Sequence, residues 1–265
     1  MRFGYCTGFA SNMMGAVNYA LLNDIAAAGY DYVEFPLMQL EALSAEEFAA
    51  LCARVPETGL ACDVCCNMFP ARVRLTGPDE RDEAVRAYLH TALERMRALN
   101  ARKVVLGSSG ARNLPEGMTH AEGVKQLSRV VGEVIAPMLD EYEIQLVMEP
   151  IGRGEANFIR TLPEGMEIVR AVNHPRVTLL ADSVHLFTER EPAEDIVTYA
   201  PYLDHIHLCE AGRALPEGGI SEGLVEILAA MRRIGYDKTA SFEPMPHGLE
   251  AMKKALVNVK AALKG

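Results

Sequence analysis

Residues 144–150 read Ile-Gln-Leu-Val-Met-Glu-Pro, a short apolar run that ends in a carboxylate and a proline. Similar runs recur along the chain, and amphipathic segments separate them. The expected strands are Arg2–Cys6, Tyr30–Phe35, Ala61–Cys65, Lys103–Leu106, Ile144–Glu149, Val177–Asp182, His205–Leu208 and Thr239–Glu243. Short runs that are apolar on both faces are typical of strands buried in a parallel sheet.

Helical periodicity is clearest in two of the intervening segments, 124–138 and 249–263. Apolar residues recur there at steps of three and four, which predicts one apolar stripe per helix. Ser44 precedes Glu47 with the spacing of a capping box at a helix start. Three glycines lie where helices should end, each just ahead of an expected strand: Gly29, Gly59 and Gly235.

The strand and helix segments alternate through the whole sequence. Eight such units in 265 residues give roughly 33 residues per unit, the spacing of a (β/α)8 TIM barrel. No linker-like run divides the chain, so we predict a single α/β domain over residues 1–265. The alternative is an open doubly wound sheet, but its usual G-x-G-x-x-G loop is missing from this sequence.

The chain is acidic, with 36 acidic and 26 basic side chains and a net charge of -10. This balance argues against nucleic acid as a partner. Residues 3–23 are uncharged, but polar residues and glycines interrupt them, so neither a signal peptide nor a membrane span is predicted. We therefore expect a cytoplasmic protein with no membrane partner. Its six cysteines should be reduced, with Cys62 and Cys65 acting as buried small residues.

Polar residues stand at the ends of four consecutive expected strands. They are Glu149, Asp182, one histidine of His205-Ile206-His207, and Glu243. The carboxyl ends of barrel strands meet at one face, where active sites are built. Three carboxylates buried together need a cation, and oxygen ligands with one imidazole suit Mn²⁺, Mg²⁺ or Co²⁺, with Zn²⁺ as a further candidate. The sequence therefore predicts one divalent metal site.

Further polar residues follow these strand ends within three to six positions: Glu155, His185 and Arg213. We expect them to form a rim that holds sugar hydroxyls. Glu34, at the end of the second expected strand, has two open interpretations, a pocket residue or a salt bridge inside the barrel.

These motifs resemble those of a known superfamily. Asp182-Ser183-Val184-His185, the segment 205–213 and Phe242-Glu243-Pro244 are similar to motifs of the xylose-isomerase-like sugar isomerases and epimerases. Within that superfamily, the D-tagatose/D-allulose (psicose) 3-epimerase group is the most similar. The resemblance covers most of the chain and is densest from Glu149 to Pro244.

The resemblance implies specific roles. One divalent metal, usually Mn²⁺ or Co²⁺, would be bound by Glu149, Asp182, His207 and Glu243. Glu149 and Glu243 would also be the catalytic acid/base pair. The substrate-binding residues would be Glu155, His185 and Arg213. In the family the arginine follows the metal histidine at the offset between His207 and Arg213, which leaves His205 as a hydrogen-bonded core residue.

The expected reaction is C3 epimerisation of a ketose, in which two carboxylates move a proton through an enediolate. Two alternatives use related chemistry: an aldose–ketose isomerase acting on a sugar phosphate, and an inosose dehydratase-like lyase. The expected partner is thus a small molecule, a sugar or a sugar phosphate. The expected role of the protein is in carbohydrate metabolism. Family habit implies a homodimer or homotetramer.

Two segments depart from the pattern or leave it open. Gly152-Arg153-Gly154-Glu155 stands where the family often has Asn-Arg-Phe-Glu. The segment 107–112, Gly-Ser-Ser-Gly-Ala-Arg, is interpreted as a tight mobile turn, with a phosphate cradle as the alternative. Arginines expected on the same face keep an anionic sugar open: Arg112, Arg153, Arg160 and Arg213.

Two other function classes fit less well. An endonuclease IV-type enzyme needs extra histidines at the ends of the third and fourth strands, where this chain has Cys65-Cys66-Asn67 and Gly107-Ser108. A non-enzymatic sugar-binding regulator should have lost one of the two acid/base glutamates, and both are present.

Overall fold

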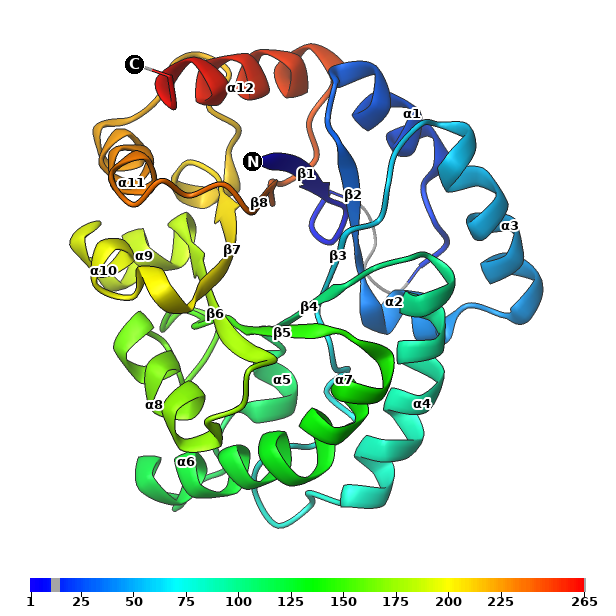
Figure 1. Cartoon of the computed structure of the whole chain (residues 1–265), viewed down its shortest axis with the longest axis vertical. Helices are drawn as coiled ribbons and strands as arrows, with labels where there is room; N and C mark the ends of the chain where they lie inside the picture. The colour runs from blue at the N-terminus through cyan, green and yellow to red at the C-terminus, as the bar shows by residue number, and fades with distance from the viewer. Residues whose placement is uncertain (11–14, 265) are drawn as a thin grey trace.

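The computed structural model describes residues 1–10 and 15–264, and in this part of the chain eight parallel strands close into a barrel (Figure 1). The strands are β1 (Arg2–Cys6), β2 (Tyr32–Pro36), β3 (Val64–Cys66), β4 (Lys103–Leu106), β5 (Gln145–Met148), β6 (Val177–Asp182), β7 (Leu203–Leu208) and β8 (Thr239–Phe242). Each strand pairs with the next in chain order, and β8 pairs with β1. The predicted barrel is confirmed, and closure excludes the open doubly wound sheet.

Helices surround the barrel on the outside (Figure 1). They are α1 (Tyr19–Ala28), α2 (Leu37–Ala42), α3 (Ala45–Glu57), α4 (Asp82–Ala98), α5 (Ser109–Arg112), α6 (His120–Arg129), α7 (Ala136–Tyr142), α8 (Leu162–Val172), α9 (Ser183–Glu189), α10 (Glu194–Thr198), α11 (Glu222–Arg233) and α12 (Leu249–Ala262). A π-helical segment, η1 (Val130–Ile135), joins α6 to α7, and two 3₁₀ turns are η2 (Ala200–Tyr202) and η3 (Ala211–Arg213). Among the described residues, none of these helices has the length and apolar character needed to cross a bilayer.

The helix ends follow the sequence signals. The Ser44 side chain accepts a hydrogen bond from the Glu47 backbone, and the Glu47 carboxylate accepts one from the Ser44 backbone, which confirms the capping box of α3. Gly29 ends α1 at a φ of 89°, a left-handed conformation that glycine adopts without strain. These ends set the chain direction into the next strand.

Two apolar layers hold the fold together. The larger lies between the barrel and the helices, and the smaller lies inside the barrel. The interior layer contains Cys6, Tyr32, Val64, Cys66, Val105, Val147 and Leu180. A Cβ atom on Gly4 would overlap the Tyr32 ring, so glycine at this position makes room for an aromatic residue in the interior. Above this layer, the same inward-facing rows continue into polar residues.

The third strand differs from its predicted range. It begins at Val64, and Ala61 forms only an isolated bridge with Tyr32. Cys62 therefore lies before the strand, its thiol donates to the backbone carbonyl of Val64 at 3.8 Å, and it packs in the same apolar layer as Cys65. Both residues are buried free thiols, as are most of the other cysteines.

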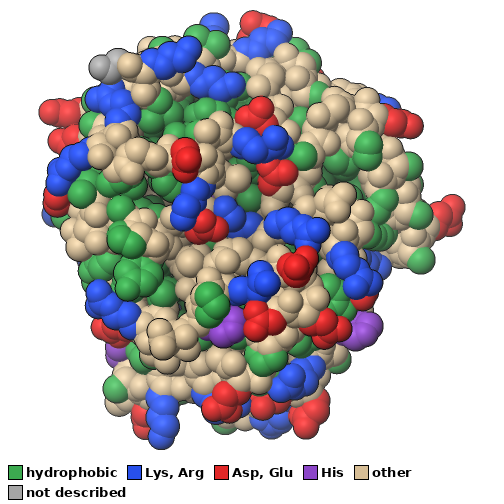
Figure 2. Space-filling view, viewed as in Figure 1, with side chains coloured by type: hydrophobic (Ala, Val, Ile, Leu, Met, Phe, Trp, Pro, Cys, Tyr) green, Lys and Arg blue, Asp and Glu red, His purple; other side chains and the backbone are tan. Residues whose placement is uncertain are grey.

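Charged side chains of both signs are interspersed on the face shown in Figure 2. No single patch of acidic residues dominates that face. The excess negative charge of the chain is therefore not gathered there, which makes the acidic cluster at the strand ends distinctive.

Candidate metal centre and sugar site

Four polar residues meet at the carboxyl ends of β5 to β8. Asp182 ends β6 and His207 lies in β7, whereas Glu149 and Glu243 each follow a strand by one residue. One ligand atom from each lies within 4.8 Å of those of the others, and all four side chains are buried. The structure thus brings together the four residues predicted to bind the metal.

The His207 ring presents one nitrogen to the three carboxylates. Its Nδ1 lies 3.2 Å from Oε1 of Glu149, 3.5 Å from Oε2 of Glu243 and 3.7 Å from Oδ2 of Asp182. His205 lies one layer deeper, and its Nε2 contacts Glu34 instead. The geometry therefore favours His207 over His205 as a ligand, as the family resemblance implies.

Asp182 supplies the clearest sign that a cation fits. Its Oδ1 accepts backbone hydrogen bonds from Val184 at 2.6 Å and His185 at 3.4 Å, because Asp182 caps α9. Its Oδ2 is buried and has no hydrogen-bond partner. A buried carboxylate oxygen without a partner is costly, and a divalent ion would satisfy it. The donor set of three carboxylates and one imidazole suits Mn²⁺, Co²⁺ or Mg²⁺.

The charges at this site do not balance among the protein groups. Burial raises the pKa of Glu149. Burial acts on Glu243 in the same direction, but Arg213 and His207 outweigh it and lower its pKa. Three buried carboxylates thus face one guanidinium and one imidazole, so a divalent cation would neutralise the excess.

The three predicted rim residues lie beside these ligands. Arg213 forms an ion pair with Glu243 through Nη1, and its Nη2 lies 3.4 Å from Nε2 of His185 and 3.7 Å from Oε1 of Glu155. The Arg213 guanidinium also stacks 4.0 Å from the centre of the Phe9 ring. The Glu155 side chain is half exposed, so it stands at the mouth of the site.

The segment after β4 is neither a phosphate cradle nor a simple tight turn. Its last four residues form the short helix α5, and the Arg112 side chain points into the protein and is fully buried. The Arg112 guanidinium donates to the backbone carbonyls of Gly107 at 2.7 Å, Glu149 at 3.0 Å and Phe158. All three guanidinium nitrogens of Arg112 donate to main-chain carbonyls, so this side chain is not free to bind an anionic sugar. We call these three hydrogen bonds the Arg112 clamp.

Two further arginines of the anionic-sugar interpretation are also paired. Arg153 binds Glu189 at 2.7 Å, and Arg160 lies 3.6 Å from Glu164. Arg213 is held by Glu243, as described above. The arginines therefore do not converge on an open anion site, which weakens the sugar-phosphate alternative.

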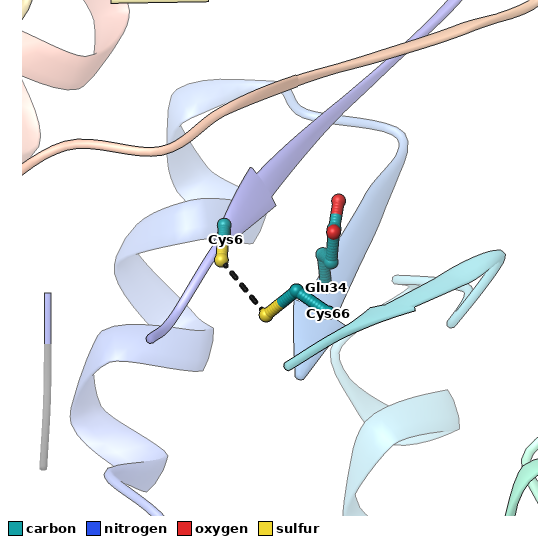
Figure 3. A group of neighbouring side chains, drawn as sticks. All are labelled: Cys6, Glu34 and Cys66. Carbon is teal, nitrogen blue, oxygen red and sulfur yellow. Dashed lines mark hydrogen bonds between the residues drawn. The ribbon is translucent and has the colours of Figure 1, made fainter. Parts of the chain in front are cut away.

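Several residues near the metal ligands were not predicted. Cys6 and Cys66 face each other at 3.3 Å (Figure 3). The Cys6 thiol also lies 3.6 Å from Oε1 of Glu243. Phe9 covers Arg213, and Gly107 lies so close to Glu149 that a Cβ atom would overlap its carboxylate. Side-chain alternation along β1 is the signal that could have placed Cys6 on the interior face.

Comparison with known proteins agrees with this geometry. The family model described as "Xylose isomerase-like TIM barrel" matches residues 22–261. D-psicose 3-epimerase of Agrobacterium fabrum is 24% identical over 229 residues, which cover 84% of this chain and 78% of the relative. Ketose 3-epimerase of Arthrobacter globiformis is 27% identical over 225 residues, which cover 82% of this chain and 73% of the relative.

Solved structures agree at the level of the fold. A crystal structure of D-psicose 3-epimerase in the presence of D-fructose superposes with a TM-score of 0.86 at 19% identity, over 100% of both chains. The curated relatives are enzymes of the isomerase class, the class predicted from the motifs. The match over nearly the whole barrel shows that this chain belongs to the xylose isomerase-like TIM barrel family.

Proposed function

We propose that this protein is a metal-dependent ketose 3-epimerase. The observation that supports this best is the cluster of Glu149, Asp182, His207 and Glu243, whose ligand atoms lie within 4.8 Å of one another. Oδ2 of Asp182 in this cluster is buried and has no hydrogen-bond partner. Its relatives named D-psicose 3-epimerase and ketose 3-epimerase support the same reaction. A bound divalent ion would supply electrostatic stabilisation of negative charge on the substrate oxygens.

The protein residues would carry the proton. Epimerisation at C3 of a ketose requires removal of the proton next to the C2 carbonyl and its return on the opposite face. Glu149 and Glu243 come from β5 and β8, on different sides of the cluster, so one carboxylate removes the proton and the other, protonated, returns one. Which of the two acts first depends on the epimer bound.

The remaining site residues would hold the sugar. Arg213, His185 and Glu155 form a connected row beside the cluster, with donors and acceptors suited to hydroxyl and carbonyl oxygens. Phe9, stacked on Arg213, adds an apolar surface at the same side. This combination favours a neutral sugar over a phosphorylated one, because Arg112, Arg153 and Arg160 are bonded elsewhere.

Solvent exchange tests the proposal. The protein is incubated in D₂O with Mn²⁺ and a panel of free and phosphorylated ketoses, and the deuterium is located by NMR. Deuterium at C3 of a free ketose, with formation of its C3 epimer, is the expected result. Exchange at C1 or C2 would show an aldose–ketose isomerase, loss of water would show a dehydratase, and either outcome would overturn the epimerase.

A further inference from the structure

Glu34 lies inside the barrel, beneath the candidate metal ligands, and its side chain is fully buried. Its Oε1 is 3.1 Å from Nε2 of His207, and its Oε2 is 3.1 Å from Nε2 of His205. The Ser241 hydroxyl donates to the same Oε2 at 2.5 Å. Figure 3 shows Glu34 on β2 beside Cys6 and Cys66, whose thiols face each other.

His205 links Thr239 to Glu34. Its Nδ1 lies 3.0 Å from the backbone carbonyl of Thr239, which can only accept, and 2.8 Å from Oγ1 of Thr239, which also accepts from the Lys103 ammonium at 2.8 Å. Its Nε2 lies 3.1 Å from Oε2 of Glu34. A chain of polar contacts thus runs from Lys103 through Thr239 and His205 to this oxygen of Glu34.

A second chain of hydrogen bonds ends on the same oxygen. The Tyr32 hydroxyl lies 2.8 Å from Oγ of Ser241, and it donates to that oxygen because Ser241 gives its own proton to Glu34. The Ser241 hydroxyl therefore delivers a donor to Glu34. An ionised carboxylate offers acceptors only, so the contact of its Oε1 with Nε2 of His207 requires the proton to lie on that nitrogen.

We propose that Glu34 is the positioning residue for His207, holding its proton on Nε2 so that the Nδ1 lone pair faces Glu149, Asp182 and Glu243. The inference rests on the proposed function, because it concerns the same metal centre. Carboxylates that accept from the far nitrogen of a ligand histidine fix its ring orientation and increase its basicity. His207 then has both nitrogens committed, one to Glu34 and one to the carboxylate cluster.

A purely structural role would have different consequences. If Glu34 served only to satisfy buried donors, its replacement would lower stability without a specific change at His207. A positioning role couples Glu34 to metal affinity and to the protonated nitrogen of one histidine. These two quantities separate the roles, and neither requires turnover.

The test compares the wild-type protein with three variants. Glu34→Gln removes the charge and leaves one acceptor oxygen in place of two. Ser241→Ala removes one donor to Glu34 but keeps the contact with His207, and Glu191→Gln is a control for a carboxylate remote from the barrel interior. Binding of Mn²⁺ to the metal-free proteins is measured by calorimetry, and the imidazole nitrogens are assigned by ¹⁵N NMR with diamagnetic Zn²⁺ bound.

We expect Glu34→Gln to weaken metal binding by about 10- to 100-fold and to shift or remove the Nε2–H signal of His207. Ser241→Ala should give a smaller loss, and Glu191→Gln should match the wild type. If Glu34→Gln fails to fold, Glu34→Asp keeps the charge but shortens the reach, and the same two changes are expected at smaller size.

The outcomes separate the positioning role of Glu34 from the proposed metal-dependent function. Unchanged affinity and an unchanged Nε2–H signal in Glu34→Gln, or in Glu34→Asp if that variant is needed, would overturn the positioning role and leave the metal site intact. A wild-type protein that binds no divalent ion would instead overturn the proposed function, and the positioning role with it.

Discussion

The guanidinium of Arg213 forms an ion pair with the carboxylate of Glu243, so a predicted sugar-binding residue is bonded directly to a predicted proton-transfer residue. Arg213 reaches this position from η3, after β7, with a left-handed φ of 59°. Together with His207, it lowers the pKa of Glu243 against the opposing effect of burial. The ion pair favours the ionised form of Glu243 before substrate binds and orients its carboxylate beside His207.

Replacing either of the glutamates proposed to transfer the proton should remove turnover while the barrel stays folded. Glu243→Gln and Glu149→Gln keep the shape of the side chain but cannot exchange a proton, so we expect a rate loss of about 10²- to 10⁴-fold. Glu217→Gln, an exposed acidic residue in the loop after η3, is the matched control. Epimerisation rates and circular dichroism check this, and near-wild-type turnover in either variant contradicts a two-carboxylate mechanism.

Gly107→Ala should weaken metal binding. A Cβ atom at this position would overlap Oε2 of Glu149, and Ile151 leaves little space on the other side. The Glu149 carboxylate must therefore shift away from the cluster, and we expect a loss of Mn²⁺ affinity of about tenfold or more. Gly154→Ala is the control, because nothing lies within 4 Å of its added methyl group. Equal affinities of the two variants, measured by calorimetry, would show that Glu149 can move without cost.

Arg112→Met should destabilise the protein. The variant keeps an unbranched apolar stem but leaves the carbonyls of Gly107, Glu149 and Phe158 without their donors. We expect a loss of about 2–4 kcal/mol in the free energy of unfolding. Arg233→Met removes an ion pair with Glu194 in which both side chains are exposed, and it should cost less than about 1 kcal/mol. Urea denaturation measures the free energy of unfolding of both variants. Equal losses would contradict a stabilising role for the Arg112 clamp.

The free energy of unfolding should depend on pH through Glu191. Burial raises the pKa of Glu191 to about 7, above the usual value of 4.5, and nearby acidic residues act in the same direction. A raised pKa in the folded state means that the stabilising effect is full below about pH 4.5 and is lost as the pH rises through 7.

Glu191→Gln should remove this dependence. Between pH 5 and pH 8 the wild type should lose about 1–2 kcal/mol relative to the variant, a value discounted because the carboxylate is only half-buried. Chemical denaturation at several pH values gives the comparison. Parallel curves for the two proteins would exclude Glu191 as the source, and Glu226→Gln, exposed on α11, should follow the wild type.

Thiol reagents should modify one cysteine of the native protein rapidly. Cys52 is half-buried on α3, whereas the remaining cysteines are buried. Burial also raises the pKa of the Cys6, Cys66 and Cys209 thiols, which lowers their thiolate content. Reaction with a chromogenic disulfide should show one fast thiol that disappears in Cys52→Ser. Two or more fast thiols in the native protein would show that the barrel interior opens readily.

Much of the barrel and its candidate metal centre could be predicted from local patterns. A short apolar run that ends in a carboxylate marks both a buried strand and its carboxyl end, so the convergence of Glu149, Asp182 and Glu243 follows once the strands are parallel and closed. The position of His185 follows in the same way, because Asp182 caps α9 and His185 lies in the first turn of that helix.

The residues that were missed depend on contacts between distant segments. Cys6 and Cys66 meet across β2, which requires the register of three strands. The direction of Arg112 depends on Phe158, which is 46 residues later and supplies one of its carbonyl partners. A pattern of small residues and an arginine cannot distinguish an anion site from such a clamp. The metal-ligand role of each residue stays a prediction until the binding experiments are done.

The Arg112 clamp has a consequence for how this protein can change. Its guanidinium bonds only main-chain carbonyls, and every amino acid presents one. Gly152 and Asn157 hold the loop after Glu149 in place, since a Cβ atom on Gly152 would lie 2.9 Å from Thr188 and the Asn157 side chain bonds the Leu114 backbone. Gly154 and Glu155 are exposed, so their side chains can be exchanged while the three carbonyls keep their positions. These two positions are thus where a combinatorial library could alter sugar preference and keep the scaffold.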